Sequence, residues 1–507
     1  MELTTGQCDR AAGVLLTQAC GDALGVPYEF AAPPAGEPRM VGGGLGPYAP
    51  GEWSDDTQMS LCIARVAARG DLTSPTAQDE VAAAFEGWLR LGASDVGTQT
   101  RLVLTEAGRW DGPAARRLRE ASERLHARTG RTAGNGALMR TGVVGLTRLG
   151  SREATATTAR ALAELTHADP LAEDSCVLWS EAVRVAVLEG RFDLVSGLDL
   201  LPAVRRGQWA AWIDEATGAE PKAFSPNGFT VRALQAAWAA VSSTDDGDGS
   251  PAHLQRALVA AVHAGDDTDT VAAIAGALLG ARYGASAVPA RWRREVHGWP
   301  GMRARDLVSL GVRTARGGVP QGSWPLVERM ATGREPARAV PHPHDPGVLL
   351  GTLADLGRTA ELGVDAVVSL CRLGTAEAPA AGVAPRDHVE VWLVDSNLPS
   401  DNAHLDFVLD DAAAAVELLR AEGRRVLLHC VHAEQRTPSV ALRYAVRQGA
   451  EAREAARLIQ TVLPSTRGYG RLWDAALGQP AGGTVMVPCS NAPCSVPSAS
   501  VTTSPTG

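Results

Sequence analysis

The sequence has few aromatic residues and no surplus of positive charge. Aromatic side chains make up 5% of the 507 residues, and the formal net charge is -9. A chain of this charge lacks the broad basic surface that binds a nucleic-acid backbone, so nucleic acid is expected only as a modified substrate. Abundant alanine and glycine favour closely packed helices over an all-β design, because alanine is the best helix former.

Signals for membranes, export and zinc are also missing. No apolar run approaches the ~20 residues that a membrane span needs. The first ten residues, MELTTGQCDR, lack a basic stretch followed by an apolar one. The eight cysteines form no Cys-x-x-Cys pair, so neither a zinc site nor a disulfide framework is indicated. These absences predict a cytoplasmic protein with no membrane partner.

The chain is long enough for two to four domains of ~150 residues each. Over residues 9–316, apolar residues recur at three- and four-residue spacing between short Gly, Pro or Asp-rich breaks, which predicts an all-α domain. The segment 270–283 is apolar nearly all round and is expected to be a central buried helix. The stretch 317–346 is rich in Pro, Gly and His and indicates a linker into a second domain, which we place at 317–337.

The second domain is predicted over residues 338–476. Strand-like runs at 366–370, 389–394 and 425–429 alternate with helical patterns at 405–422, 437–448 and 451–462. This alternation predicts a compact α/β domain with a mostly parallel sheet. Residues 477–507 are rich in Ser, Thr, Pro and Gly, offer little to bury, and are predicted to be disordered.

Two acidic clusters each open a predicted helix. The first is GEWSDDT at 51–57, and the second is GDDTDT at 265–270. Helix capping would explain one carboxylate or hydroxyl at each place. Each cluster carries more than capping needs, and burying several like charges is costly unless a cation compensates. Oxygen ligands without Cys or His favour Mg²⁺, Mn²⁺ or Ca²⁺ over zinc, and spacing alone leaves both capping and metal binding open.

Five motifs in order resemble the ADP-ribosylglycohydrolase family, over about residues 9–316. They are GDALGVPYE at 21–29, SDDT at 54–57, GNGALMR at 134–140, THA at 166–168 and DTDT at 267–270. The resemblance implies an all-α fold with two Mg²⁺ or Mn²⁺ ions. It also implies hydrolysis of the glycosidic bond between ADP-ribose and an ADP-ribosylated protein or another conjugate.

The resemblance also implies roles for single residues. The metal ligands would be Ser54, Asp55, Asp56, Asp267, Asp269 and Thr270. Ser54 stands where the family often has Thr, and Asp266 stands where it often has Gly. Glu29 would position substrate or water and shares the candidate role of general base with Asp55 and Asp56; the alternative is an exposed Glu after a turn.

The same resemblance implies a substrate cleft. Backbone N–H groups of Gly134, Asn135, Gly136 and Ala137 would approach the ADP-ribose diphosphate, and His167 would line the same cleft. The alternatives are structural, since most Gly-rich turns only start helices and a lone His often serves as a hydrogen-bond partner.

A second motif lies at 426–437, VLLHCVHAEQRT. A strand leads into Cys430, five residues intervene, and Arg436 begins a helix. The N–H groups of such a loop and the guanidinium can surround a phosphate, and the same positive field favours a thiolate nucleophile. The motif resembles the dual-specificity branch of the cysteine-dependent protein phosphatases, over about residues 338–476.

This second resemblance implies that Asp395 is the general acid, with Asp401 as the alternative, and that the Thr437 hydroxyl stabilises the thiolate. The sequence departs from the family at Ala433, where a Gly is usual, and at Glu434, which adds a negative charge to the loop. The alternative for Cys430 is a buried cysteine that ends a strand. Three hypotheses follow: a hydrolase fused to a phosphatase, a hydrolase fused to a non-catalytic phosphate reader, and a binding protein without turnover.

Overall fold

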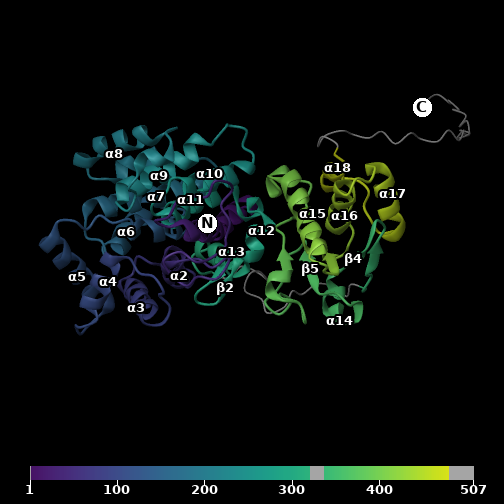
Figure 1. Cartoon of the computed structure of the whole chain (residues 1–507), viewed down its shortest axis with the longest axis horizontal. Coiled ribbons are helices and arrows are strands. Elements are labelled where there is room, and N and C mark those ends of the chain that lie inside the picture. Colours follow the sequence, from purple (N-terminus) through teal and green to yellow (C-terminus); the bar gives the residue numbers. More distant parts are fainter. Residues whose placement is uncertain (1, 320–335, 479–507) are drawn as a thin grey trace, which may run out of the picture.

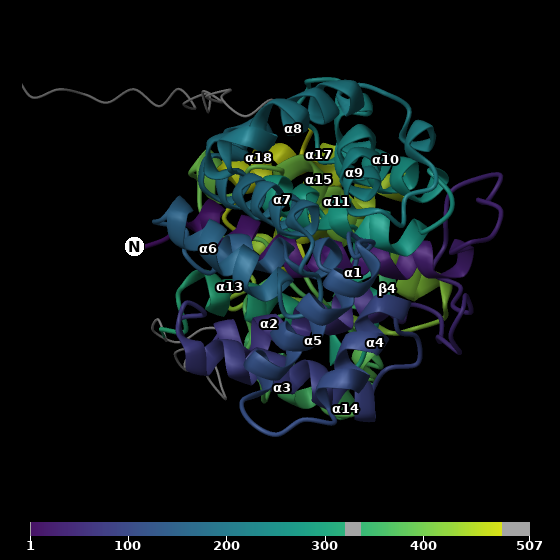
Figure 2. The same cartoon turned by 90° about the vertical axis from the view of Figure 1, so that its left-hand side faces the viewer.

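The computed structural model describes residues 2–319 and 336–478, which form two lobes side by side (Figure 1). The first lobe is helical and runs from purple to teal, and the second runs from green to yellow. Seen from the side of the first lobe, its helices lie in front of the second lobe (Figure 2). The predicted linker and tail fall mostly on residues 320–335 and 479–507, outside the described residues. Within the described ranges, no helix has both the length and the apolar character to cross a membrane.

The first lobe is mostly helical, as the three- and four-residue spacing predicts, and its described residues form thirteen α-helices. They are α1 (Thr5–Gly25), α2 (Asp55–Ala67), α3 (Pro75–Leu91), α4 (Thr98–Ala107), α5 (Ala114–Thr129), α6 (Arg152–Ala163), α7 (Pro170–Glu189), α8 (Ala203–Ala216), α9 (Thr230–Ser243), α10 (Ala252–His263), α11 (Thr268–Tyr283), α12 (Ala290–Glu295) and α13 (Ala304–Ala315). The all-α prediction needs one correction. Strands β1 (His297–Gly298) and β2 (Met302–Arg303) form an antiparallel pair, and two residues are too few to show an alternating pattern.

Helix α11 is the central buried helix that the sequence predicts, and every residue in it except Arg282 is buried. It packs directly against the backbone of α1. A Cβ atom on Gly13 would lie 2.3 Å from the Gly280 carbonyl oxygen, and one on Gly25 would lie 2.3 Å from the Asp269 Cα. Only glycine permits such an approach, because it has no Cβ. The contact at Gly25 brings the end of α1 to the start of α11, where the second acidic cluster lies.

The second lobe has a five-stranded sheet with helices around it. Its elements are β3 (Val340–His342), β4 (Asp345–Gly351), α14 (Thr359–Leu362), β5 (Ala366–Ser369), β6 (His388–Glu390), α15 (Leu405–Ala421), β7 (Val426–His429), α16 (Arg436–Arg447), α17 (Ala452–Val462) and α18 (Arg471–Ala476). The strand order is β3-β4-β7-β5-β6, and only the β3-β4 pair is antiparallel. A mostly parallel sheet in this part of the chain is thereby confirmed.

Two details of the second lobe differ from the sequence-based expectation. Strand β3 and the start of β4 lie in the Pro-, Gly- and His-rich stretch 317–346, inside the predicted second domain but outside the strand-like runs. Pro341 and Pro346 hid both strands, because proline removes a backbone donor and counts against a strand. Strand β6 ends at Glu390, earlier than the apolar run 389–394 suggests.

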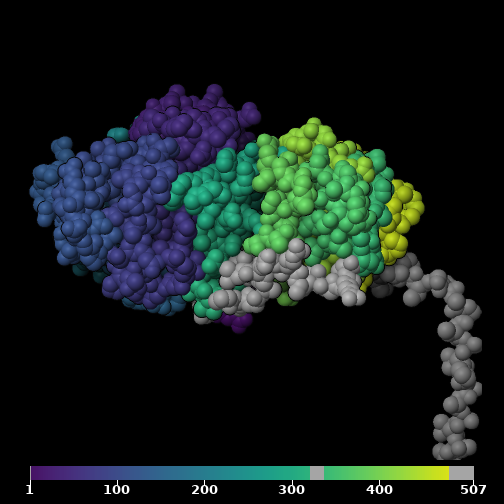
Figure 3. Space-filling model, turned by 90° about the horizontal axis from the view of Figure 1, so that it is seen from below, coloured from purple at the N-terminus to yellow at the C-terminus, as the bar shows by residue number. Residues whose placement is uncertain are grey.

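The two lobes meet at α12 and α13, which belong to the teal segment between the blue and green surfaces in Figure 3. Arg293 lies 3.1 Å from Asp411, and Arg294 lies 2.7 Å from Asp387. All four side chains are largely buried, and an ion pair out of water is screened little. The interface is therefore polar as well as packed.

Candidate active sites

The two acidic clusters come together where α2 and α11 begin. Carboxylate oxygens of Asp22, Asp56 and Asp269 lie within 4.8 Å of one another, and those of Glu29, Asp267 and Asp269 form a second such group. Asp269 belongs to both groups, so the two adjoin. The arrangement could hold two metal ions side by side.

Capping does not account for these carboxylates. Ser54 and Asp267 stand at the N-cap positions of α2 and α11, and neither makes a capping hydrogen bond. One oxygen of Asp56, Oδ1, is buried and has no hydrogen-bond partner among the described residues. A buried carboxylate oxygen without a donor is unusual. It is the position that a hard cation with oxygen ligands would fill, so the residues present fit Mg²⁺ or Mn²⁺.

The electrostatics of the cluster also favour a cation. Burial raises the pKa of Asp56 well above its usual value, and repulsion by Asp22 and Asp55 raises it further. Burial likewise raises the pKa of Asp269, and repulsion by Asp56 and Glu29 raises it further. The Thr270 hydroxyl hydrogen-bonds to Asp56, which offsets part of this rise. A divalent cation would offset far more, because it is the largest local charge in any site that binds it.

Asp22 is a residue that sequence reasoning missed as a functional one. Its Oδ1 accepts hydrogen bonds from the Ser54 N–H and hydroxyl, both at 2.8 Å. Its Oδ2 accepts from the Thr57 N–H at 2.9 Å and from the Thr57 hydroxyl at 2.6 Å. Asp22 therefore satisfies the start of α2 from outside the helix. The Ser54 hydroxyl also lies 3.0 Å from Asp56 Oδ2, so Oδ1 is the Asp56 oxygen that stays without a partner among the described residues. Its place in the 21–29 motif was the available signal.

Glu29 follows α1 and is half-buried rather than exposed. Burial, together with repulsion by Asp267, Asp95 and Asp55, raises its pKa to about 9. Burial raises the pKa of the partly exposed Asp55. Asp95, in the loop between α3 and α4, contributes the largest repulsion to this rise. No signal in the sequence points to Asp95, since it is a single carboxylate in a loop.

The Gly-rich turn lies beside the second acidic group. The Asn135 side-chain amide donates to Asp267 Oδ2 at 2.7 Å. The Asn135 backbone N–H donates to the Gly228 carbonyl at 3.1 Å, so this N–H is already engaged. His167 packs under the turn: a Cβ atom on Gly136 would lie 3.2 Å from its ring. Burial lowers the His167 pKa well below its usual value, as does Arg140, so the ring is neutral.

Asp266, the extra charge in the second cluster, is turned away from it. The residue has a left-handed backbone with φ of 54°. Its carboxylate accepts a hydrogen bond from the Ser225 hydroxyl. Asp266 belongs to neither acidic group, and it provides a neighbouring carboxylate for comparison.

The cysteine loop joins β7 to α16 as the sequence suggests. Cys430 is buried directly after β7, and Arg436 begins α16. Arg436 Nε lies 3.7 Å from Asp395 Oδ2, and Arg436 Nη1 donates to the Leu370 carbonyl at 3.0 Å. Within the described ranges, Asp395 and not Asp401 is the carboxylate that contacts Arg436.

The structure shows how the loop accommodates Ala433 and Glu434, the two residues that differ from the phosphatase pattern. Ala433 adopts φ of 57°, a left-handed conformation that costs a non-glycine residue roughly 1–2 kcal/mol. Glu434 turns its charge to Arg467, whose guanidinium lies 2.9 Å away. In the first turn of α16, the Thr437 and Ser439 hydroxyls are buried and lack a hydrogen-bond partner within the described part of the chain. These hydroxyls are available to a group in the loop.

Comparison with known proteins assigns the first lobe to a family. The family model for ADP-ribosylglycohydrolases matches residues 3–319. The match spans more than half of the chain, so the chain belongs to the ADP-ribosylglycohydrolase family.

Individual relatives agree with this assignment. ADP-ribosylarginine hydrolase Tri1 of Pseudomonas putida is 32% identical over 57% of this chain and 74% of that protein. ADP-ribosyl-[dinitrogen reductase] glycohydrolase of Rhodospirillum rubrum is 29% identical over 56% of this chain and 89% of that protein. The crystal structure of human DUSP28 covers 28% of this chain and 93% of its own, with 20% identity and a TM-score of 0.24, a likeness too low to carry an argument.

Proposed function

We propose that the first lobe hydrolyses the bond between ADP-ribose and a modified acceptor, with two Mg²⁺ or Mn²⁺ ions. The observation that carries this proposal is the pair of adjoining acidic groups that share Asp269. The proposed ligands are Ser54, Asp55, Asp56, Asp267, Asp269 and Thr270. We place this hydrolase domain at residues 9–316 and the second domain at 338–476. Two hydrophobic clusters support a division of this kind, although Ala290 belongs to the second cluster and Trp392 packs against the first.

The chemistry follows from the carboxylates. Bound divalent cations would supply Lewis-acid polarisation of a water molecule and hold the ribose hydroxyls. Asp55, Asp56 or Glu29 accepts a proton from the water as its oxygen attacks the anomeric carbon and the bond to the acceptor breaks. The bonding electrons leave with the acceptor atom, which takes up the proton that the carboxylate received. The remaining carboxylates stabilise the positive charge that develops on the sugar. The Gly-rich turn would bind the rest of ADP-ribose, with the buried His167 supporting the turn from beneath. The products are free ADP-ribose and the unmodified acceptor.

An arginine-linked ADP-ribosyl protein is the first substrate to test, because a relative carries ADP-ribosylarginine in its name. Release of ADP-ribose is measured from arginine-, serine- and DNA-linked substrates, with Mg²⁺, with Mn²⁺ and with EDTA. Wild type is compared with Asp269→Ala and with the matched control Asp266→Asn, whose carboxylate turns away from the cluster. We expect metal-dependent release that is lost in Asp269→Ala and kept in Asp266→Asn. Binding of ADP-ribose without release from any substrate would favour a binding protein and contradict the proposal.

The second lobe supports a second function, cysteine-dependent hydrolysis of a phosphate ester. The observation that favours it is the contact between Arg436 and Asp395 beside the loop that holds Cys430. The Cys430 thiolate attacks phosphorus, the bond to the leaving oxygen breaks, and Asp395 protonates that oxygen. Water then attacks the phosphocysteine, the S–P bond breaks, Asp395 takes the water proton, and phosphate leaves. The unpartnered Thr437 hydroxyl supports this proposal, because it could donate to the thiolate.

Turnover and binding separate a phosphatase from a phosphate reader. The rate of phenyl phosphate hydrolysis and the affinity for tungstate are measured for wild type, Cys430→Ser and Asp395→Asn. Loss of turnover in both variants, with tungstate affinity kept in Asp395→Asn, is the expected result. Tungstate binding without turnover in the wild type would make the second lobe a non-catalytic reader.

A further inference from the structure

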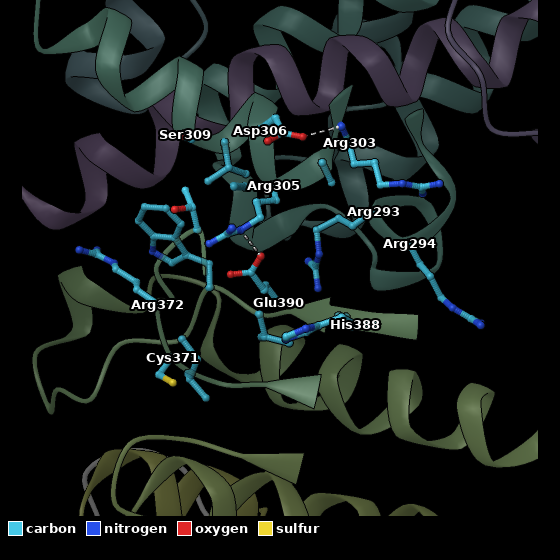
Figure 4. A pocket seen from close by; sticks show the side chains of 18 of the residues that line it. Arg293, Arg294, Arg303, Arg305, Asp306, Ser309, Cys371, Arg372, His388 and Glu390 are labelled. Atoms are coloured by element: carbon cyan, nitrogen blue, oxygen red, sulfur yellow. Dashed lines mark hydrogen bonds and ion pairs between the residues drawn. The ribbon is translucent and has the colours of Figure 1, made fainter. Parts of the chain in front are cut away.

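A cavity of about 150 Å³ lies between the two lobes, next to the loops that surround Arg436 (Figure 4). The first lobe contributes Arg303, Arg305 and Val308 to its wall. The second lobe contributes Glu390 from β6 and Trp392 and Leu393 from the segment that follows. Figure 4 shows Arg305 reaching across this space to Glu390.

Arg305, in the first turn of α13, makes an unusual number of contacts with the second lobe. Its Nε donates to Glu390 at 2.9 Å. Its Nη2 donates to the carbonyls of Leu373 at 2.9 Å and Gly374 at 2.8 Å, and its Nη1 lies 3.3 Å from the Ala378 carbonyl. The planar guanidinium has five donors in a rigid arrangement, so it can hold several acceptors in fixed relation. Arg305 thereby joins β6 to the loop that follows β5.

Arg436 holds the same two segments from the other side. Its Nη1 donates to the Leu370 carbonyl at 3.0 Å and lies 3.5 Å from the Leu393 carbonyl. Leu370 directly follows β5, and Leu393 precedes Asp395 by two residues. One arginine from each lobe therefore contacts both the segment after β5 and the stretch 390–393, which leads to the proposed general acid.

A second connection runs from β6 to the cysteine. His388 Nε2 lies 2.8 Å from the Ser369 hydroxyl, which lies 2.6 Å from His429 Nε2. The Ala380 N–H donates to His388 Nδ1, so in the neutral ring the proton is on Nε2 and points to Ser369. Ser369 then donates to His429, whose Nδ1 lies 3.3 Å from the Cys430 carbonyl. Glu390, which Arg305 holds, is two residues from His388 on the same short strand.

We propose that Arg305 is a positioning residue for the Cys430 site. Through it the hydrolase lobe fixes the segments 370–378 and 391–395, and with them the placement of Asp395 against the leaving group. The phosphate chemistry of the second lobe thus depends on the docked first lobe. This inference rests on the proposed phosphatase function.

The test uses the leaving group, because the proton that Asp395 gives to the leaving oxygen matters only when that oxygen is basic. Phenyl phosphate needs this proton and 4-nitrophenyl phosphate needs it little. The measured quantity is kcat/KM, which reports the transfer to Cys430 without the later attack of water, a step that both esters share. General acid catalysis contributes roughly 10²–10⁴-fold, so a displaced but present acid should cost roughly tenfold in kcat/KM. In the full chain, we expect Arg305→Gln to lower kcat/KM for phenyl phosphate about tenfold and to leave that for 4-nitrophenyl phosphate within about twofold.

Three comparisons make the result specific. Arg303→Gln, in the same cavity wall, should match wild type, because the Arg303 guanidinium makes no such set of contacts with the second lobe within the described ranges. Arg305→Lys should recover part of the rate, since an ammonium can still pair with Glu390. Release of ADP-ribose by Arg305→Gln reports that the first lobe is folded. An unchanged ratio of the two kcat/KM values in Arg305→Gln would overturn the proposal.

Failure of the phosphatase proposal itself gives a different result. If the wild type hydrolyses neither ester, the coupling is judged from amide hydrogen exchange, which needs no turnover. Faster exchange over 370–378 and 391–395 in Arg305→Gln, relative to Arg303→Gln, supports the structural coupling. Equal exchange in the two variants overturns it.

Discussion

Replacing Asp269 with Asn tests the metal centre through stability rather than activity. Asp269 has carboxylate neighbours within 4.8 Å in both acidic groups. Two unit charges at this distance repel by about 3.5 kcal/mol at an effective dielectric constant of 20. Protonation relieves part of this repulsion, because burial and repulsion raise the pKa of Asp269 and Asp56. Without metal, Asp269→Asn should therefore stabilise the first lobe by roughly 1–2 kcal/mol.

Saturating metal should reverse this order. A ligand at a hundred times its Kd stabilises the native state by about 2.7 kcal/mol. Wild type gains this free energy when it binds the metal. Asp269→Asn gains little of it, because Asp269 belongs to both acidic groups. Asp269→Asn should be the more stable protein in EDTA, and wild type should be the more stable one in Mg²⁺.

Thermal unfolding of the full chain in EDTA and in Mg²⁺ measures both effects. One kcal/mol corresponds to about 2–4 °C in Tm for 150–250 residues, so the shift on adding Mg²⁺ should be about 5 °C or more for wild type. Asp266→Asn is the matched control and should respond to Mg²⁺ as wild type does. Equal Mg²⁺ responses in wild type and Asp269→Asn would refute the assignment of this cluster as the metal centre.

Three further predictions concern single residues. Asp22→Ala removes the acceptor of four hydrogen bonds at the start of α2 and should lower stability by about 2–3 kcal/mol and Mg²⁺ affinity about 10–100-fold, measured by denaturation and calorimetry. Glu29, with its pKa raised to about 9, binds more protons in the folded state than in the unfolded state from about pH 4.5 to 9. Stability in EDTA should therefore fall as pH rises through this window, and Glu29→Gln should flatten the slope. Gly13→Ala would place a Cβ atom 2.3 Å from a carbonyl oxygen of α11 and should cost about 1–3 kcal/mol in unfolding free energy.

Each of these has a clear opposite outcome. Unchanged Mg²⁺ affinity in Asp22→Ala would mean that the start of α2 does not depend on this carboxylate. A slope in EDTA as steep for Glu29→Gln as for wild type would show that other groups set the pH dependence. Gly87→Ala, in α3 with open space around its Cβ position, is the control for Gly13→Ala and should be neutral or slightly stabilising. Equal costs at the two glycines would contradict the close packing of α1 on α11.

The sequence by itself determined the helical character of the first lobe, the parallel sheet of the second, and the family. These features depend on local patterns: apolar spacing along each helix, short apolar strands, and motifs a few residues long. The acidic residues that open α2 and α11 could be recognised for the same reason. Strand β3 could not, because Pro341 and its neighbours look like a linker when the adjacent strand is unknown.

Only the tertiary structure decided which distant groups meet. Asp22 joins Asp56 and Asp269 because glycines on α1 let its backbone touch α11, more than 240 residues later in the chain. Likewise, nothing near Arg305 in the sequence indicates that it holds carbonyl groups beside the Cys430 loop. A carboxylate or guanidinium acts on what lies within a few ångströms, and packing of whole helices and lobes sets those neighbours.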